Sequence, residues 1–129
     1  MIERSFPQSI EAEQAVLGAV FLKPTLLPEI NEILASVDFY RPEHGVLYGH
    51  LQKMSTAGEA IDLVTVTESM RSRDLLDKVG GLGFLTAINQ SVPTAANARH
   101  YVDIVLEKSR RRQIIDAGTA IVNAAYDES

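Results

Sequence analysis

Residues 91–105 read SVPTAANARHYVDIV and contain the start of what we expect to be one long helix. Pro93 cannot continue an incoming helix, Thr94 can cap the free N–H groups of a new one, and alanines follow. No further proline occurs up to Tyr126. A helix of about 30 residues would be roughly 45 Å long, which exceeds what a domain of this size needs for its own core. We therefore expect part of this helix to pack against another chain.

The apolar residues of this helix recur at helical spacing, along one side that drifts slowly around the axis. The inner group, between Tyr101 and Leu106, is expected to complete the core of the preceding residues. The outer group follows a cluster of basic residues, where a compact head has little surface left to offer. Because burial of a large aliphatic side chain stabilises by about 1.5–3 kcal/mol, we interpret the outer group as a partner interface. This group consists of Ile114, Ile115, Ile121 and Val122.

The composition indicates one soluble domain in a reducing compartment. The chain has 129 residues, of which 46% are hydrophobic, and this is enough for a core. It has no cysteine, so disulfides and thiolate metal sites are excluded. The first residues lack the apolar stretch of a signal peptide, and no apolar run approaches the roughly 18 residues of a membrane span. We expect a cytoplasmic protein without membrane contact.

The net charge of −5 is unevenly distributed. Residues 1–98 carry seven Lys and Arg against twelve Asp and Glu, whereas residues 99–129 carry five of each. Nucleic acid is therefore not an obvious partner for the whole domain, since phosphate binding needs a basic surface. The exception is a basic cluster that could contact a phosphate backbone or an acidic protein, or could lie solvated beside Glu107 and Asp116. It comprises Lys108, Arg110, Arg111 and Arg112. Nucleic-acid binding through this cluster stays open as an alternative function, although we expect it to be weak.

Residues 1–97 are predicted to form a bundle of short helices, which we call the head. Ser9 can cap a first helix that ends before Pro24, and its first turns carry acidic residues that suit the helix dipole. A second helix is expected at about Leu26–Leu34. Pro42 begins a third, which ends near Gly58.

The rest of the head is also expected to be helical. Residues 61–70, IDLVTVTESM, favour a strand by propensity but also carry Asp62 as a helix cap. Helix is favoured, because the sequence offers no second strand for pairing. Glycines at positions 80 and 81 indicate a turn, followed by a short helix that presents Leu82, Leu85 and Ile88. The prediction is an all-α fold: about six short helices, then the long helix over 98–129.

Signals for catalysis or metal binding are scarce. His44, His50 and His100 form no i, i+4 pair, and each is more typical of a surface or half-buried helix position. The glycines at 80, 81 and 83 match neither pattern of a phosphate-binding loop. We therefore expect no catalytic, cofactor-binding or metal-binding residue, and no enzyme activity.

Two residues of the head are further candidates for partner contact. Glu11 lies at a helix start, where it either contacts a partner or only complements the helix dipole. Phe84 follows the glycine-rich turn and falls off the Leu82, Leu85 and Ile88 stripe. It either protrudes as a contact residue or packs into the core.

Five segments, taken in order, resemble the N-terminal domain of bacterial DnaB-type replicative helicases. They are PQSIEAEQAVLGA at 7–19, DFYRPEHGVLY at 38–48, IDLVTVTE at 61–68, VGG at 79–81, and VPTAAN with the following Tyr and IV-x-EK segment at 92–108. Relatives often have an apolar residue where Arg110 or Arg111 stands. The basic cluster is therefore specific to this sequence, and the resemblance assigns it no role.

The resemblance implies a helical head and a helical hairpin, with the long helix as the first arm of the hairpin. Two copies pair through their hairpins, and three pairs form a collar above a hexameric motor ring. Primase and, in some species, the helicase loader act on this collar. Family members continue into a second arm, a linker and a RecA-like motor that uses ATP and Mg, and we expect this chain to end before them. The expected function is non-catalytic: assembly of the ring and recruitment of primase and possibly the loader during DNA replication, without a cofactor in this fragment.

Overall fold

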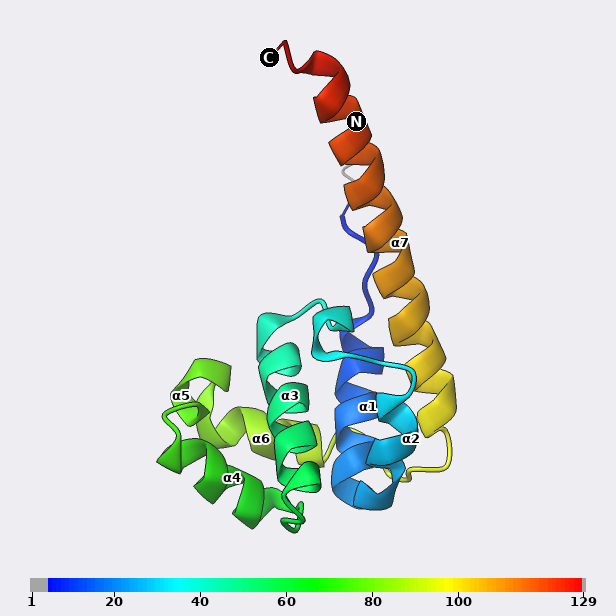
Figure 1. The fold of residues 1–129 in the computed structure, drawn as a ribbon. Helices are drawn as coiled ribbons and strands as arrows, with labels where there is room; N and C mark the ends of the chain where they lie inside the picture. The colour runs from blue at the N-terminus through cyan, green and yellow to red at the C-terminus, as the bar shows by residue number, and fades with distance from the viewer. Residues whose placement is uncertain (1–4, 129) are drawn as a thin grey trace.

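The computed structural model describes residues 5–128, and within them every regular element is helical. Figure 1 shows a head of short helices from which one long helix, α7, extends away. The prediction of an all-α fold with a long final helix is confirmed. The elements are α1 (Ile10–Leu22), η1 (Pro24–Leu26), α2 (Leu27–Asn31), η2 (Ser36–Asp38), α3 (Pro42–Thr56), α4 (Leu63–Ser72), α5 (Leu76–Val79), α6 (Gly81–Asn89) and α7 (Ala98–Tyr126), where η denotes a 3-10 turn.

Helix α1 is the centre of the head and contacts α3, α6 and α7. The Ser9 hydroxyl accepts a hydrogen bond from the Ala12 N–H at 3.2 Å, as predicted for a cap. Gly18 permits close packing against the end of α6, because a Cβ there would lie 2.2 Å from Ser91 Oγ. Ser91 Oγ in turn donates to the Gln14 carbonyl at 2.9 Å.

The ambiguous segment at 61–70 is helical, and its start explains why. Asp62 Oδ1 accepts from the Thr65 N–H at 2.8 Å, and Thr65 Oγ1 accepts from the Asp62 N–H at 2.9 Å. This reciprocal pair satisfies two N–H groups that the helix itself leaves free. Val66 and Met70 are fully buried on the inner side of α4. Capping and one-sided burial therefore outweigh the strand propensity of the valines and threonines.

Three predicted details of the helices are wrong. The second helix ends at Asn31 rather than near Leu34, after a 3-10 turn. Thr94 does not cap the long helix: α7 begins at Ala98, and Thr94 Oγ1 accepts from the Ala96 N–H at 3.2 Å in the preceding turn. Leu82, expected on the inner face of α6, is 51% exposed.

The inner half of α7 completes the core of the head, as predicted. Val102 and Val105 are buried against it, and Tyr101, Ile104 and Leu106 pack around them. In the part of the chain that the structure describes, no helix combines the length and the apolar character needed to cross a bilayer. Over the same residues, no three His, Asp or Glu side chains gather as a possible metal site.

Candidate partner interface

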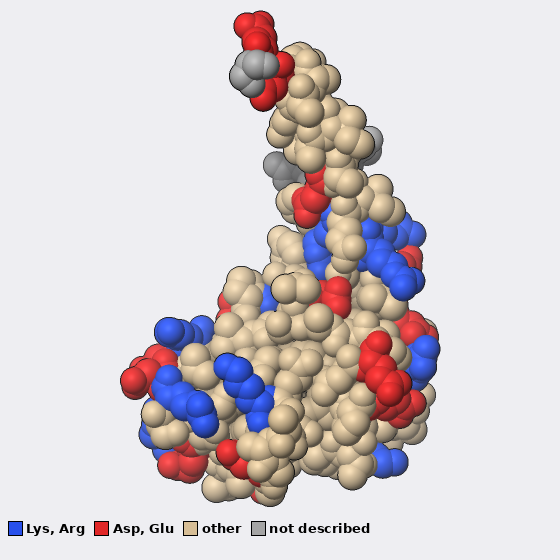
Figure 2. Space-filling view, viewed as in Figure 1, with Lys and Arg blue, Asp and Glu red and all other residues tan. Residues whose placement is uncertain are grey.

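The outer half of α7 extends beyond the helices of the head (Figure 1). Every residue from Gln113 to Glu128 is exposed. Among them are large apolar side chains that a folded domain normally covers: Ile114 is 70% exposed, Ile121 71% and Val122 53%. Ile115 is exposed as well. Figure 2 shows this part of α7 as a mostly uncharged rod with acidic residues at its tip. The outer residues predicted as an interface thus lie together on an unsupported helix.

The inner and outer apolar residues of α7 lie on roughly opposite sides of the helix, which corrects the prediction of one slowly drifting side. The head contacts α7 through Ala98, Val102, Val105 and Ser109, all of which are buried. At 100° per residue, the direction of Ile114, Gly118, Ile121 and Ala125 differs from that of the buried group by roughly 160°. The outer stripe therefore does not continue the core of the head.

The basic cluster is divided between two roles. Figure 2 shows Lys and Arg side chains gathered where α7 leaves the head. Arg112 faces the head: its guanidinium donates to the Pro7 carbonyl at 2.8 Å and to the Asp38 carbonyl at 2.7 Å. It also lies 5.4 Å from the ring centre of Tyr40. Arg111 is paired with Glu107 at 2.9 Å. Arg112 is therefore engaged by the head, whereas Arg110 and Arg111 are exposed to solvent.

We expect Arg112→Met to lower the free energy of unfolding by about 2 kcal/mol, because two hydrogen bonds from a charged group and a cation–π contact are lost. Arg110 is exposed and has no hydrogen bond or ion pair within the described residues, so Arg110→Met is the matched control. We expect this control to change stability by less than about 0.5 kcal/mol. Urea unfolding followed by circular dichroism measures both. Equal stabilities of the two variants would show that Arg112 does not anchor α7.

Ser109 and Asp38 form a second connection between α7 and the head. Asp38 is 8% exposed, and its carboxylate accepts from Ser109 Oγ and from the Ala35 N–H, both at 2.7 Å. Together with Arg112, these contacts attach α7 to the η2 turn immediately before the helix becomes free. The direction in which the outer half projects is therefore determined by the head.

Glu13 on α1 binds the segment between η2 and α3 through hydrogen bonds. This carboxylate is 1% exposed, and it accepts from the Tyr40 N–H at 2.7 Å and the Arg41 N–H at 3.3 Å. His44 Nδ1 lies 2.7 Å from it. Glu13 thus satisfies N–H groups at the start of α3, where the helix dipole favours a negative charge. In the sequence, Glu13 was only an acidic residue in the first turns of the first helix, and this role was not predicted.

The remaining predicted residues differ in exposure. Glu11 is exposed on α1, where a partner can reach it. Phe84 is half-buried, with its ring stacked 5.9 Å from that of His44, so it packs on the core more than it protrudes. The expectation that the histidines lie at surface or half-buried positions is wrong for two of them: His44 is 1% exposed and His50 is 3% exposed.

Comparison with known proteins identifies the family. The sequence pattern of the family described as DnaB-like helicase N terminal domain matches residues 5–107. The chain belongs to this family. It is 48% identical over 124 residues to the replicative DNA helicase DnaC of Bacillus subtilis and 46% identical to the replicative DNA helicase DnaB of Geobacillus stearothermophilus. Each alignment covers 96% of this chain and 27% of the relative, so the chain spans about a quarter of their length.

Solved structures of the DnaB-like family show the same fold. The N-terminal domain of DnaB helicase from Mycobacterium tuberculosis superposes with a TM-score of 0.91 at 39% identity, and covers 95% of this chain and 89% of its own. A DnaB-like replicative helicase, described together with its interactions with primase, has a TM-score of 0.79 at 26% identity over 92% of this chain and 28% of its own. The recognition of a DnaB-type N-terminal domain from sequence is confirmed.

Proposed function

We propose that this domain is a non-catalytic assembly and recruitment module of a cytoplasmic bacterial replicative helicase. The outer half of α7 carries the proposal: fourteen successive residues, 113–126, are exposed, and their apolar stripe points away from the head side of the helix. A stripe of this kind is typical of a surface that another helix covers. We assign it to pairing with further copies of the domain.

Under this proposal the domain holds no cofactor. The replicative helicases that it resembles are about four times as long, and we place ATP and Mg in a motor domain of the parent protein, outside residues 1–129. The parent would unwind DNA with that motor. The N-terminal domain would supply contacts only, and DNA would reach it through the assembled ring.

We further propose primase as a partner, and the helicase loader as a second one. Support comes from the DnaB-like relative that is described with its interactions with primase. The contact surface on this chain would join Glu11 on the head to the outer residues of α7, with the half-buried Phe84 at its edge. A surface that combines one carboxylate with large apolar side chains suits a partner that presents both basic and apolar groups.

We expect Ile115→Ala to weaken binding of the C-terminal part of the cognate primase at least tenfold, because a contact residue near the centre of an interface contributes about 1.4 kcal/mol or more. Phe84→Ala should weaken binding too, with some loss of packing against His44. Calorimetric titration measures both. Val64 on α4 is 72% exposed and lies outside the proposed surface, so Val64→Ala is the control for loss of apolar area. Unchanged affinity for both Ile115→Ala and Phe84→Ala, with normal melting, would refute this placement of primase.

A further inference from the structure

A groove of about 900 Å³ runs along α3 on a part of the head that the proposed function does not use. Helix α3 lines it from Pro42 to Thr56, and η2 and Leu75 lie at its borders. This stretch of α3 is about 21 Å long at 1.5 Å per residue, which matches a helical peptide of about 14 residues. A groove of this length is suited to one helix and is longer than a small ligand needs.

The lining of the groove combines exposed valines with glycines of α3. Val37 is 83% exposed and Val46 is 38% exposed, so both offer apolar surface at the groove. Gly45 is packed against η2, since a Cβ there would lie 2.9 Å from the Ser36 carbonyl oxygen, whereas Gly49 has no side chain and leaves the surface of α3 open to the groove. Large apolar side chains of an incoming helix could therefore approach the backbone of α3 closely.

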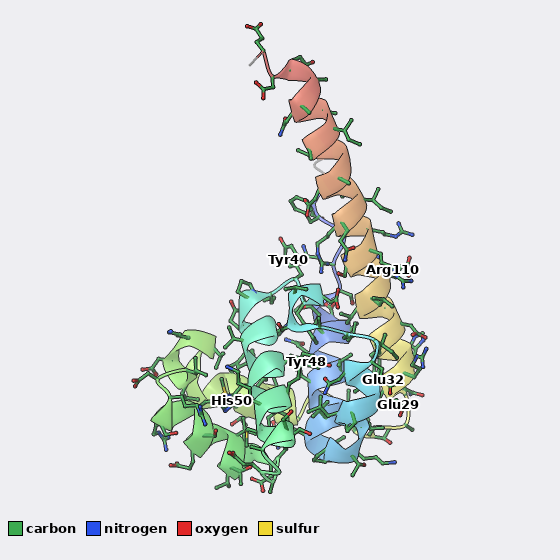
Figure 3. All side chains as sticks on the ribbon, in the orientation of Figure 1. Glu29, Glu32, Tyr40, Tyr48, His50 and Arg110 are labelled. Atoms are coloured by element: carbon green, nitrogen blue, oxygen red, sulfur yellow. The ribbon has the colours of Figure 1, made fainter. Side chains whose placement is uncertain are left out.

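His50 lines the same groove and has an unused hydrogen-bonding atom. It is 3% exposed, and its Nε2 lies 2.8 Å from Ser69 Oγ. Its Nδ1 is buried and has no partner among the described residues. Burial, with a smaller effect of the Arg73 charge, lowers the pKa of His50, so the ring is neutral at physiological pH. A buried ring nitrogen without a partner is unfavourable, and a polar group of a bound segment would supply the missing hydrogen bond. Figure 3 shows His50 on the side of α3 that faces α4 and α6.

The charge at the groove favours an acidic occupant. Lys53 lines the groove, and Arg73 is close enough to influence His50. Neither cation has an ion-pair partner within 4 Å in the described part of the chain. Glu59 is the nearby anion that acts on His50, and it offsets only part of this charge. Lys53 is therefore the unpaired cation that lines the groove, and it would pair with a carboxylate of an occupant.

We propose that the α3 groove binds an acidic amphipathic helix of another protein, about 14 residues long. Its apolar side chains lie between Val37 and Val46, a polar group reaches His50, and a carboxylate pairs with Lys53. This site is separate from the outer half of α7 and does not depend on its role.

The test selects binders from a displayed library of random 14-residue peptides, with the whole chain as bait, and measures one enriched peptide by fluorescence anisotropy. Gly49→Leu fills the groove, because a Cβ at Gly49 meets only Ser36 Cβ, at 3.8 Å, and leucine favours the helix more than glycine does. Lys53→Glu reverses the charge. Lys78→Glu is its control, since Lys78 is an exposed cation on α5 outside the groove.

We expect enrichment of peptides that combine Asp or Glu with Leu, Ile or Phe at helical spacing. Binding should weaken at least tenfold in Gly49→Leu and in Lys53→Glu, and should persist in Lys78→Glu and in Ile121→Asp. Three outcomes would overturn the proposal: no acidic amphipathic enrichment, unchanged affinity for Gly49→Leu, or loss of binding in Ile121→Asp, which would place the peptides on α7. Loss of self-association in Gly49→Leu would also overturn it, because the groove would then hold a second copy of the chain.

Discussion

Replacement of Glu13 by alanine should lower the free energy of unfolding by about 3 kcal/mol, because a buried carboxylate with three hydrogen-bonding partners is removed. The Tyr40 and Arg41 N–H groups and His44 Nδ1 all contact this carboxylate at present. Alanine would leave them without a partner in the protein and would detach the start of α3 from α1. For a small domain with a total stability of about 5–15 kcal/mol, this is a large fraction. Urea unfolding followed by circular dichroism measures the change.

Glu11 is the natural control for this prediction. It lies in the same turn of α1 and carries the same charge, but it is exposed. Glu11→Ala should cost no more than about 1 kcal/mol, through the helix dipole alone. Glu13→Gln should fall between the two alanine variants, since its amide keeps one acceptor oxygen. If Glu13→Ala and Glu11→Ala were equally stable, Glu13 would not hold α3 in place.

The second large effect concerns association rather than folding. We expect Ile121→Asp to weaken self-association of the domain at least 100-fold, because it removes an isoleucine that association would bury and places a carboxylate in an apolar contact. Ile121 is 71% exposed in the single chain and touches no part of the core, so melting of the head should be nearly unchanged. Sedimentation equilibrium gives the association constant, and thermal unfolding gives the stability.

Asn123→Asp is the matched control, since it adds the same charge two residues away. Asn123 is exposed and lies about 160° around the helix from Ile121, off the apolar stripe. The Asn123→Asp variant should associate like the original chain. Equal weakening in both variants would point to general charge repulsion between copies and not to a specific apolar contact.

Much of the fold could be predicted from the sequence because local signals agreed with it. Ser9, Pro42 and Asp62 begin helices where predicted, and the all-α class followed from the absence of a strand partner for residues 61–70. The capping role predicted for Thr94 was wrong, because its hydroxyl accepts from the Ala96 N–H in the turn before α7. Pattern and propensity do not distinguish a cap from a turn when both use the same hydroxyl group.

The polar contacts of the candidate site could not be predicted in the same way. Arg112 looks like Arg110 and Arg111 in the sequence, but it alone of the three faces Pro7 and Asp38. Glu13 looks like a second dipole residue beside Glu11 until the fold brings Tyr40 to it. Both side chains act across distances of 27 or more residues, and such pairs depend on how the helices pack. The exposure of the outer stripe was predictable, since no part of the head was left to cover it.

Sedimentation of the unmodified chain over a wide concentration range tests the central claim most directly, namely that the outer half of α7 is where this domain meets other chains. We predict a rise of the average mass from monomer towards dimer between micromolar and millimolar concentration, with the rise absent in Ile121→Asp. Helix content must be followed in parallel by NMR of residues 113–126, because an unsupported helix end can fray. A strict monomer up to millimolar concentration, with α7 intact to Tyr126, would contradict the account.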